Sequence, residues 1–485
     1  MNYASSSVGY KRSSRRSRGL RRRAIALVVL LAVIFIVLLV AHAHSASGTV
    51  ASNVVFEARS TQFSGEQALK NASCVAGKLR APSTERACAS AATVPSWSND
   101  ERDRLARELH STFAGSLSGA KGWSLAVIGA DGRTIFDDRA QSAVAPASVQ
   151  KLVVAATALD ALGPAYRYHT VFAAGEAIPQ NGELGGDLWL IGSGDPSLQS
   201  ADLRNGIGML RRLGLHRIAG SVIVDDTTLS GPALNPHWTT DDNGQDYAAP
   251  TSAISLDGDT IESHQAIAGV EQRVWIPMQD VPRYVGQRVN GMLRQSGVPA
   301  EKPPEVGAAP LESVVLWDHR SAPLQALESH MLYVSDNHYA EQLLRTVGEE
   351  ATGAANDAGG IAAEQQFLAR RGIPEPALRL YDGSGLSPQN RVAAITLARL
   401  LYDDQPSLYM LLPRGGREGT LEDYPFTTAL GRVRAKSGHL SDVSALAGYV
   451  TTTGHGRVAF AFLVDGSPGD PDTAIVRAVD RLATF

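Results

Sequence analysis

The chain has only two cysteines, Cys74 and Cys88, among its 485 residues. It also lacks a His-Glu-x-x-His pattern, and its twelve histidines do not gather with other candidate ligands. Zinc and other transition metals need such groups of ligands at short spacing. The sequence therefore predicts neither a metal site nor a cofactor. The two cysteines lie 14 residues apart and either form a disulfide or remain thiols, which the sequence leaves open.

Acidic residues are absent from the first 23 positions, which carry eight lysines and arginines. Residues 24–41 follow as 18 uncharged, mostly apolar positions, a length that fits a bilayer span. Because basic residues stay on the cytoplasmic side, we expect a cytoplasmic tail over 1–23, a transmembrane anchor over 24–43 and a stalk over 44–97. This pattern predicts a single-pass protein of the cell membrane, with the part of the chain after the anchor outside the cytoplasm. A cleaved signal peptide is the alternative.

Basic residues are scarce in the rest of the chain, where 37 lysines and arginines stand against 49 aspartates and glutamates. The resulting net charge of about −12 disfavours binding to nucleic acid phosphates. Hydrophobic residues make up 44% of the chain, which is ample for a buried core. The length leaves room for two or three domains.

Only two of the seven lysines, Lys121 and Lys151, have a serine three positions earlier. Ser118 lies in a glycine-flanked stretch that is typical of a connector. Ser148 is followed by apolar residues at helical spacing, which predicts a helix beginning near Ser148. Such a helix places Lys151 beside Ser148 and directs backbone N–H groups at an oxyanion formed there. A plain helix-capping serine is the alternative interpretation.

Two further clusters follow in the chain, Ser335-Asp336-Asn337 and Lys436-Ser437-Gly438. Taken singly, a turn and a strand end explain them. In this order, however, the three clusters match the S-x-x-K, S-D-N and K-T-G set of serine acyl-transfer enzymes. A serine hydroxyl needs a base, and no histidine is clearly placed beside Ser148 in the sequence. We therefore predict that neutral Lys151 takes the Ser148 proton, with Lys436 as a neighbouring cation.

The periodicity after residue 97 predicts an α+β fold. Two hairpins are expected, one over residues 123–136 with an Asp-Gly turn and one over 443–464, with helices near both ends of this part. Several short strands are expected between the first two clusters. We therefore predict a catalytic domain over 98–170 and 311–485, interrupted by a β-rich inserted domain over 171–310.

With these clusters the sequence resembles the class C low-molecular-mass penicillin-binding proteins, a family of D-alanyl-D-alanine carboxypeptidases and endopeptidases of bacterial cell-wall metabolism. The resemblance covers residues from about 122 to 485. Besides the three clusters, it rests on seven stretches: 186–196, 224–226, 249–256, 321–324, 340–344, 382–387 and 443–449.

The resemblance implies a β-lactamase/transpeptidase-like fold and a role for each cluster. Ser148 would be the nucleophile and Lys151 its base, while Ser335 and Asn337 would relay protons and bind a substrate amide. Lys436 would supply the positive charge that attracts the substrate carboxylate. Ser437, Gly438 and His439 would bind substrate. Peptidoglycan stem peptides would be the substrates and β-lactam antibiotics covalent inhibitors.

One departure concerns His439, which stands where relatives usually carry a serine or threonine that contacts the terminal carboxylate. An imidazole can still donate to a carboxylate, so the sequence leaves open whether a free D-alanine end is preferred. Two alternative functions remain. A class A-like β-lactamase would need a carboxylate such as Glu375 to activate water, and a catalytically silent wall-binding protein would need none of these residues.

Overall fold

Residues 96–267, 270–467 and 469–485 are described by the computed structural model. The chain divides into two compact units, residues 1–91 and 92–485, and the described residues belong to the second. The tail expected over 1–23, the anchor expected over 24–43, Cys74 and Cys88 lie outside the described residues. So does nearly all of the stalk expected over 44–97.

In the described part of the chain, no helix is long and apolar enough to cross a membrane. The longest helix there is α3 (Asn99–Leu117), which has only 19 residues and carries charged side chains along its exposed face. A bilayer span needs about 20 mostly apolar residues. The expectation of a single-pass membrane protein is corrected by this finding.

A five-stranded antiparallel sheet forms the centre of the catalytic part, in the order β14-β15-β16-β1-β2. Its strands are β1 (Gly122–Ile128), β2 (Thr134–Asp138), β14 (Val433–Leu440), β15 (Val443–Thr451) and β16 (Arg457–Asp465). Both predicted hairpins are therefore confirmed. β1 pairs with β16, so the strands of this sheet that come first and last in the chain are neighbours in space.

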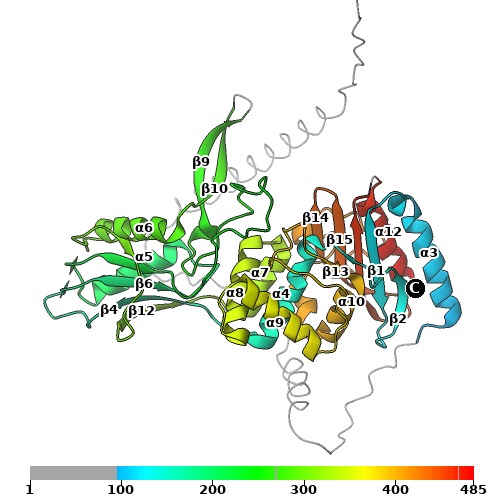
Figure 1. The fold of residues 1–485 in the computed structure, drawn as a ribbon, viewed down its shortest axis with the longest axis horizontal. Helices are drawn as coiled ribbons and strands as arrows, with labels where there is room; N and C mark the ends of the chain where they lie inside the picture. The colour runs from blue at the N-terminus through cyan, green and yellow to red at the C-terminus, as the bar shows by residue number, and fades with distance from the viewer. Residues whose placement is uncertain (1–95, 268–269, 468) are drawn as a thin grey trace, which may run out of the picture. The chain divides into compact units, whose positions relative to one another are not determined.

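Helices cover both faces of this sheet, because successive side chains of its strands are buried on opposite sides. On one face Leu125 and Val127 pack against α3 and α12 (Pro471–Thr484). On the other face Ala126 and Ile128 belong to a second apolar cluster with the remaining helices (Figure 1). These helices are α4 (Lys151–Ala161), α7 (Leu324–Val334), α8 (Asn337–Thr352), α9 (Asp357–Arg370), α10 (Ala394–Asp403) and α11 (Gln405–Leu408). The α+β class predicted from the sequence is confirmed.

Short elements link these layers and carry much of the site described below. They are the two-stranded pair β3 (Ala143–Val144) and β13 (Val392–Ala393), and the 3₁₀ turns η1 (Ala147–Gln150), η3 (Tyr409–Leu411) and η4 (Gly419–Leu421).

A second five-stranded sheet, in the order β11-β8-β6-β4-β12, lies in the insertion between α4 and α7. Its strands are β4 (His169–Ala174), β6 (Leu188–Gly192), β8 (Val222–Asp225), β11 (Glu305–Val306) and β12 (Val314–Arg320). Two helices that the sequence analysis did not predict pack with it: α5 (Ser200–Arg212) and α6 (Val281–Gln295). Since β4 and β12 are paired and belong to this sheet, we propose that the inserted domain runs from residue 169 to residue 320 rather than from 171 to 310.

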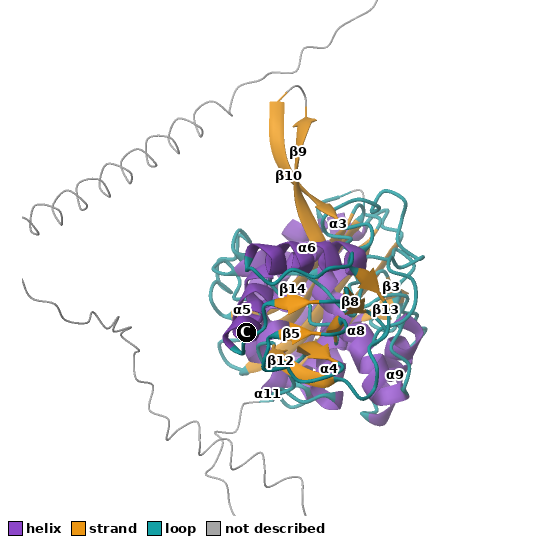
Figure 2. Ribbon diagram, turned by 90° about the vertical axis from the view of Figure 1, so that its left-hand side faces the viewer, coloured by secondary structure: helices purple, strands orange, loops and turns teal. Residues whose placement is uncertain are grey.

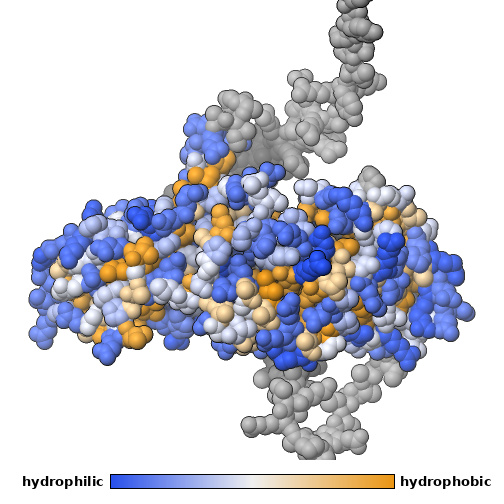
Figure 3. Space-filling view, viewed as in Figure 1, coloured by the Kyte–Doolittle hydropathy of each residue, from blue (hydrophilic) through white to orange (hydrophobic). Residues whose placement is uncertain are grey.

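The insertion also contains a long hairpin, β9 (Thr260–Ile267) and β10 (Val270–Pro277), which projects from the elements around it (Figures 1 and 2). It follows the 3₁₀ turn η2 (Asp257–Asp259), and a small pair of strands, β5 (Glu183–Leu184) and β7 (Arg217–Ile218), completes the insertion. On the face drawn in Figure 3, hydrophobic residues gather near the base of this hairpin.

Candidate active site

Ser148 lies in the turn η1, directly before α4, and its side chain is half-buried. The preceding residue, Ala147, has a positive φ of 47°, a conformation that non-glycine residues rarely adopt. Strained backbone of this kind persists only where the surroundings hold it in place. The turn therefore presents the Ser148 hydroxyl at the start of α4, as the spacing predicts.

Lys151 is completely buried, and its amine contacts three groups from different parts of the chain. Lys151 Nζ donates to Ser148 Oγ at 3.0 Å, to Asn337 Oδ1 at 2.6 Å and to the Ser384 carbonyl oxygen at 2.8 Å. Burial lowers the pKa of Lys151 to about 8, although Glu341, Asp382 and Asp336 act in the opposite direction. An amine with this pKa is neutral in a useful fraction of molecules near neutral pH.

Ser335 and Asn337 flank the break between α7 and α8. Ser335 ends α7 in the left-handed conformation, with φ 66°, and Asp336 caps α8 by accepting from the Tyr339 N–H. This break turns Asn337 toward Lys151 and Ser335 toward Lys436.

Lys436 lies on β14 and is also completely buried. Its Nζ donates to Ser335 Oγ at 2.9 Å and to the carbonyl oxygen of Ser437 at 2.7 Å. Burial, together with the charge of Lys151, lowers the pKa of Lys436 well below its ordinary value. Two buried amines that repel each other hold one proton more readily than two.

Gly438 allows β14 to approach the turn that carries Ser148. A Cβ atom at this position would lie 3.0 Å from the backbone nitrogens of Ser148 and Val149 and from the Pro146 carbonyl oxygen. The absence of a side chain therefore leaves a narrow space between β14 and the Ser148 N–H. Such a space can hold an oxyanion between backbone donors.

Ser437 and His439 point to other partners in the unliganded site. Ser437 Oγ donates to Thr420 Oγ1 at 2.9 Å, so a second hydroxyl lies beside it. His439 Nε2 lies 3.0 Å from Asp472 Oδ1 on α12, and both side chains are about half exposed. The structure thus brings Ser148, Lys151, Ser335, Asn337 and Lys436 together, whereas the imidazole of His439 is held by Asp472.

The loop of residues 382–388 supports the site, and the sequence analysis assigned it no role. Glu341 accepts the backbone N–H groups of Ser384 at 2.8 Å and Gly383 at 3.2 Å. Asp382 is buried and accepts from the Gly385 and Ser387 N–H groups. These contacts aim the Ser384 carbonyl at Lys151. The loop motif was visible in the sequence, but its buried partners come from elements far along the chain.

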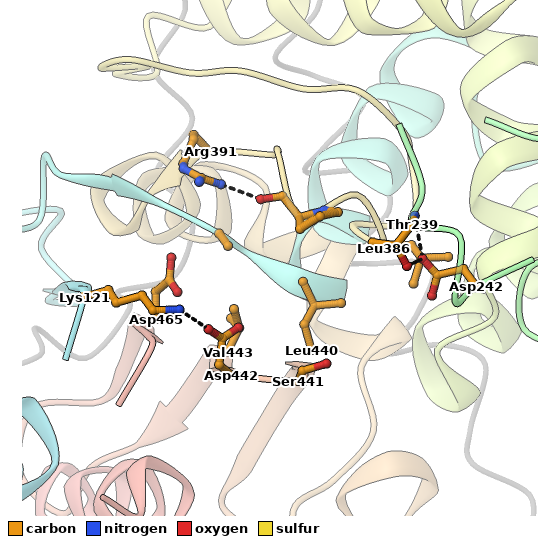
Figure 4. Close-up of a pocket in the computed structure, with 12 residues that line it drawn as sticks. Lys121, Thr239, Asp242, Leu386, Arg391, Leu440, Ser441, Asp442, Val443 and Asp465 are labelled. Carbon is orange, nitrogen blue, oxygen red and sulfur yellow. Dashed lines mark hydrogen bonds and ion pairs between the residues drawn. The ribbon is translucent and has the colours of Figure 1, made fainter. Parts of the chain in front are cut away.

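Two cavities border the site. One, of about 310 Å³, lies beyond the end of β14 and is lined by Leu440, Leu386, Arg391 and the paired Lys121 and Asp442 (Figure 4). The other, of about 360 Å³, begins at Ser335 and Asn337. The inserted-domain loop 239–247 contributes residues to both cavities.

Comparisons with known proteins give matches over most of the described chain. Residues 112–272 and 267–484 match the D-Ala-D-Ala carboxypeptidase 3 (S13) family. The chain is 27% identical over 445 residues to the D-alanyl-D-alanine carboxypeptidase of Actinomadura sp. strain R39, covering 76% of this chain and 82% of that protein.

Among solved structures, penicillin binding protein 4 of Haemophilus influenzae is similar in fold. It aligns with a TM-score of 0.70 at 21% identity, covering 78% of this chain and 99% of that one. The same protein complexed with a β-lactam aligns with a TM-score of 0.64 at 21% identity, covering 77% and 98%.

Proposed function

The chain belongs to the D-Ala-D-Ala carboxypeptidase 3 (S13) family, and on this premise we propose that it cleaves D-alanyl-D-alanine and related bonds of peptidoglycan stem peptides through a serine acyl-enzyme. The observation that carries the proposal is the contact of the buried Lys151 amine with Ser148 Oγ at 3.0 Å. An amine in this position can accept the proton of the serine hydroxyl when the serine attacks.

Acylation begins when Ser148 Oγ attacks the substrate carbonyl and its proton passes to neutral Lys151. The backbone N–H groups of Ser148 and His439 would hold the oxyanion, each worth ~3 kcal/mol. Ser335 then donates its hydroxyl proton to the leaving amine and regains a proton from Lys436, its hydrogen-bond partner. Lys436 in turn recovers the proton that Lys151 took from Ser148, so that Lys151 is neutral again. Water then attacks the acyl-enzyme and gives a proton to Lys151, which returns it to Ser148 Oγ as the acyl bond breaks and the shortened peptide leaves.

In the unliganded site burial lowers the pKa of both amines, and the charge of Lys151 lowers that of Lys436 further. A substrate carboxylate beside Lys436 and Ser437 would favour the protonated form of Lys436. Because the two amines repel each other, this change favours neutral Lys151. Binding of the correct substrate would thus prepare the base.

The role of the substrate-binding residues follows from their positions. Asn337 would bind an amide of the substrate, and Gly438 leaves room for the reacting carbonyl beside β14. The cavity of Figure 4, with Lys121, Arg391 and several aspartates in its wall, suits the charged acyl part of a stem peptide. A β-lactam would acylate Ser148 in the same way and block it.

The two alternative functions find less support. Among the described contacts of Glu375, none joins it to Ser148 or Lys151, so a water-activating carboxylate of the β-lactamase kind is not supplied by this residue. A silent binding protein does not explain why polar residues from three parts of the chain form this set of contacts around Ser148 and Lys151.

Labelling with a fluorescent penicillin tests this function. We expect a stable adduct on the wild-type protein and none on Ser148→Ala, which keeps its fold because Ser148 is half-buried and Lys151 retains two other partners. Mass spectrometry of a pentapeptide and of muropeptides then identifies the bond that is cut. Labelling of the variant would remove Ser148 from the mechanism, and rapid turnover of the penicillin would favour a β-lactamase.

A further inference from the structure

A further cavity, of about 460 Å³, lies in the catalytic part and has no role in the chemistry above. Its lining residues come from the β1–β2 turn, the junction of α10 with α11 and the first residue of β16: Ala130, Tyr402, Asp403, Gln405, Pro406 and Arg457. The other end of β16 is Asp465, which lines the cavity of Figure 4. Since a strand rises about 3.3 Å per residue, Arg457 and Asp465 lie about 26 Å apart. The cavity is therefore remote from the active site.

Arg457 brings a positive charge to this cavity, and its guanidinium group is held by stacking. Its Cζ atom lies 3.5 Å from the centre of the Tyr409 ring. Its Nε atom is buried without a hydrogen-bond partner, and its side chain forms no ion pair with any residue that the structure describes. A guanidinium group fixed in this way keeps its terminal N–H groups available for the two oxygens of a carboxylate.

Asp403 brings the opposite charge to the same cavity, and it is half-buried. Burial raises its pKa, although the charges of Arg399 and Arg371 lower it. Neither arginine is its partner, because Arg371 pairs with Asp404 at 2.6 Å and Arg399 donates to the Gly132 carbonyl oxygen at 3.0 Å. A partly dehydrated carboxylate without a partner gains more from an ammonium group than a carboxylate in water does.

Two opposite charges thus line one cavity and form no ion pair with each other. Asp403 would repel an anion and Arg457 would repel a cation, whereas a ligand that carries both charges satisfies both side chains. We propose that this cavity binds a zwitterion of dipeptide size, with its carboxylate on Arg457 and its ammonium group on Asp403. A single alanine would leave most of the volume empty, which favours a dipeptide. This site is additional to the one that holds Ser148, and its existence does not depend on the proposed reaction.

Isothermal titration calorimetry with D-alanyl-D-alanine tests the site on protein whose Ser148 has been acylated with a penicillin, so that the active site is blocked. We expect saturable binding with a Kd of about 1 mM or lower. Arg457→Gln and Asp403→Asn should each raise the Kd about tenfold, the effect of one lost contact to a charged group. Arg294→Gln, at an exposed position on α6, serves as the matched control with an unchanged Kd.

Two analogues of the dipeptide assign each charge to its partner. N-acetyl-D-alanyl-D-alanine lacks the ammonium group, so it should bind the wild type about tenfold more weakly than the dipeptide does. It should bind Asp403→Asn as well as the dipeptide does, because the partner of the ammonium group is already gone. D-alanyl-D-alaninamide lacks the carboxylate and should show the same behaviour with Arg457→Gln. A variant that merely folds poorly would not show this pairing of analogue with variant.

Absence of saturable binding up to about 10 mM, or equal Kd values for the wild type and both variants, would overturn the proposal. Binding that disappears when Ser148 is acylated would also overturn it, because the ligand would then occupy the active site. A protein that forms no penicillin adduct would refute the proposed function but not this site, because the two variants and the two analogues still report on the cavity by themselves.

Discussion

Lys151 and Lys436 are the residues on which the chemistry depends most. Both amines are fully buried, and each contacts a different serine. A lysine in water would be protonated and unable to accept the Ser148 proton. Burial and mutual repulsion change this balance, so that no histidine is needed as the base.

The rate of acylation should therefore depend on pH through Lys151. We expect the second-order rate constant for a penicillin to rise with pH and to level off above a midpoint of about 8, because only the neutral amine accepts the proton. Stopped-flow measurement between pH 5 and 10 gives this profile.

Two variants make the pH profile specific. Lys151→Ala should acylate far more slowly and lose the rising limb, whereas Lys302→Ala, an exposed lysine of the inserted domain, should keep both rate and midpoint. A wild-type profile that stays flat from pH 6 to 9 would exclude Lys151 as the titrating base.

At this scale the sequence predicted which residues meet but not what supports them. Ser148 and Lys151 could be found because one helical turn places them side by side. The sequence did not indicate the supporting residues Glu341, Ser384 and Thr420, because their contacts with the site join elements far apart in the chain. The imidazole of His439 was expected near substrate, and only the fold places Asp472 beside it.

At the scale of elements, the loop 382–388 packs against the turn η1. Gly385 has φ 82°, and a Cβ atom there would lie 2.0 Å from the carbonyl oxygen of Ala147. The loop and the turn therefore fit only when position 385 has no side chain. The position of Ser148 depends on this contact.

Gly385→Ala should consequently damage both stability and activity. The new methyl group meets backbone atoms, which cannot rotate away, and the positive φ is unfavourable for alanine. We expect a loss of about 2 kcal/mol or more in unfolding free energy and an acylation rate at least ~100-fold lower. Urea denaturation and penicillin labelling measure the two effects.

The matched control is Gly353→Ala at the end of α8, where φ is also positive but no atom lies within 4 Å of the new Cβ. It should lose some stability through backbone strain alone and retain the rate of acylation. Equal rates for the two variants would show that the loop does not position Ser148.

The two helices of the inserted domain show why some elements escape prediction. α5 contains Gly206 and Gly208, and α6 contains Pro282, Gly286 and Gly291, all residues of low helix propensity. At Gly206 a Cβ atom would lie 2.9 Å from the ring of Trp317, so packing requires glycine there. Tertiary contacts that form only in the folded domain override the local preference.

At the scale of the whole molecule, several carboxyl groups are buried with little compensation. Glu364 is completely buried, and neither of its carboxylate oxygens has a hydrogen-bond partner among the described residues. Burial raises its pKa well above 4.5, and burial together with Asp382 raises the pKa of Glu341 to about 8. The folded protein therefore holds protons that the unfolded chain would release.

Stability should fall as pH rises. A carboxyl group whose pKa is raised on folding stabilises the fold most at low pH, and this contribution is lost as pH rises from 4.5 toward the folded value, about 8 for Glu341. Glu364→Gln removes one such group, so we expect its Tm to exceed that of the wild type by about 2 °C at pH 8 and by less at pH 5.

Differential scanning calorimetry at both pH values checks this prediction. Glu349→Gln, an exposed position on α8, should shift Tm little at either pH. A Glu364→Gln variant that is destabilised more at pH 8 than at pH 5 would contradict the proposed direction.

The pairing of β1 with β16 has a consequence for synthesis on the ribosome. The strand made first in the catalytic sheet pairs with β2 directly, but its second partner, β16, is translated more than three hundred residues later. Until then the nascent polypeptide carries an apolar strand with one edge unpaired, and Ser148 is present without Lys436. Catalytic activity therefore appears only once translation is nearly complete. A prematurely terminated chain would be inactive and prone to aggregate.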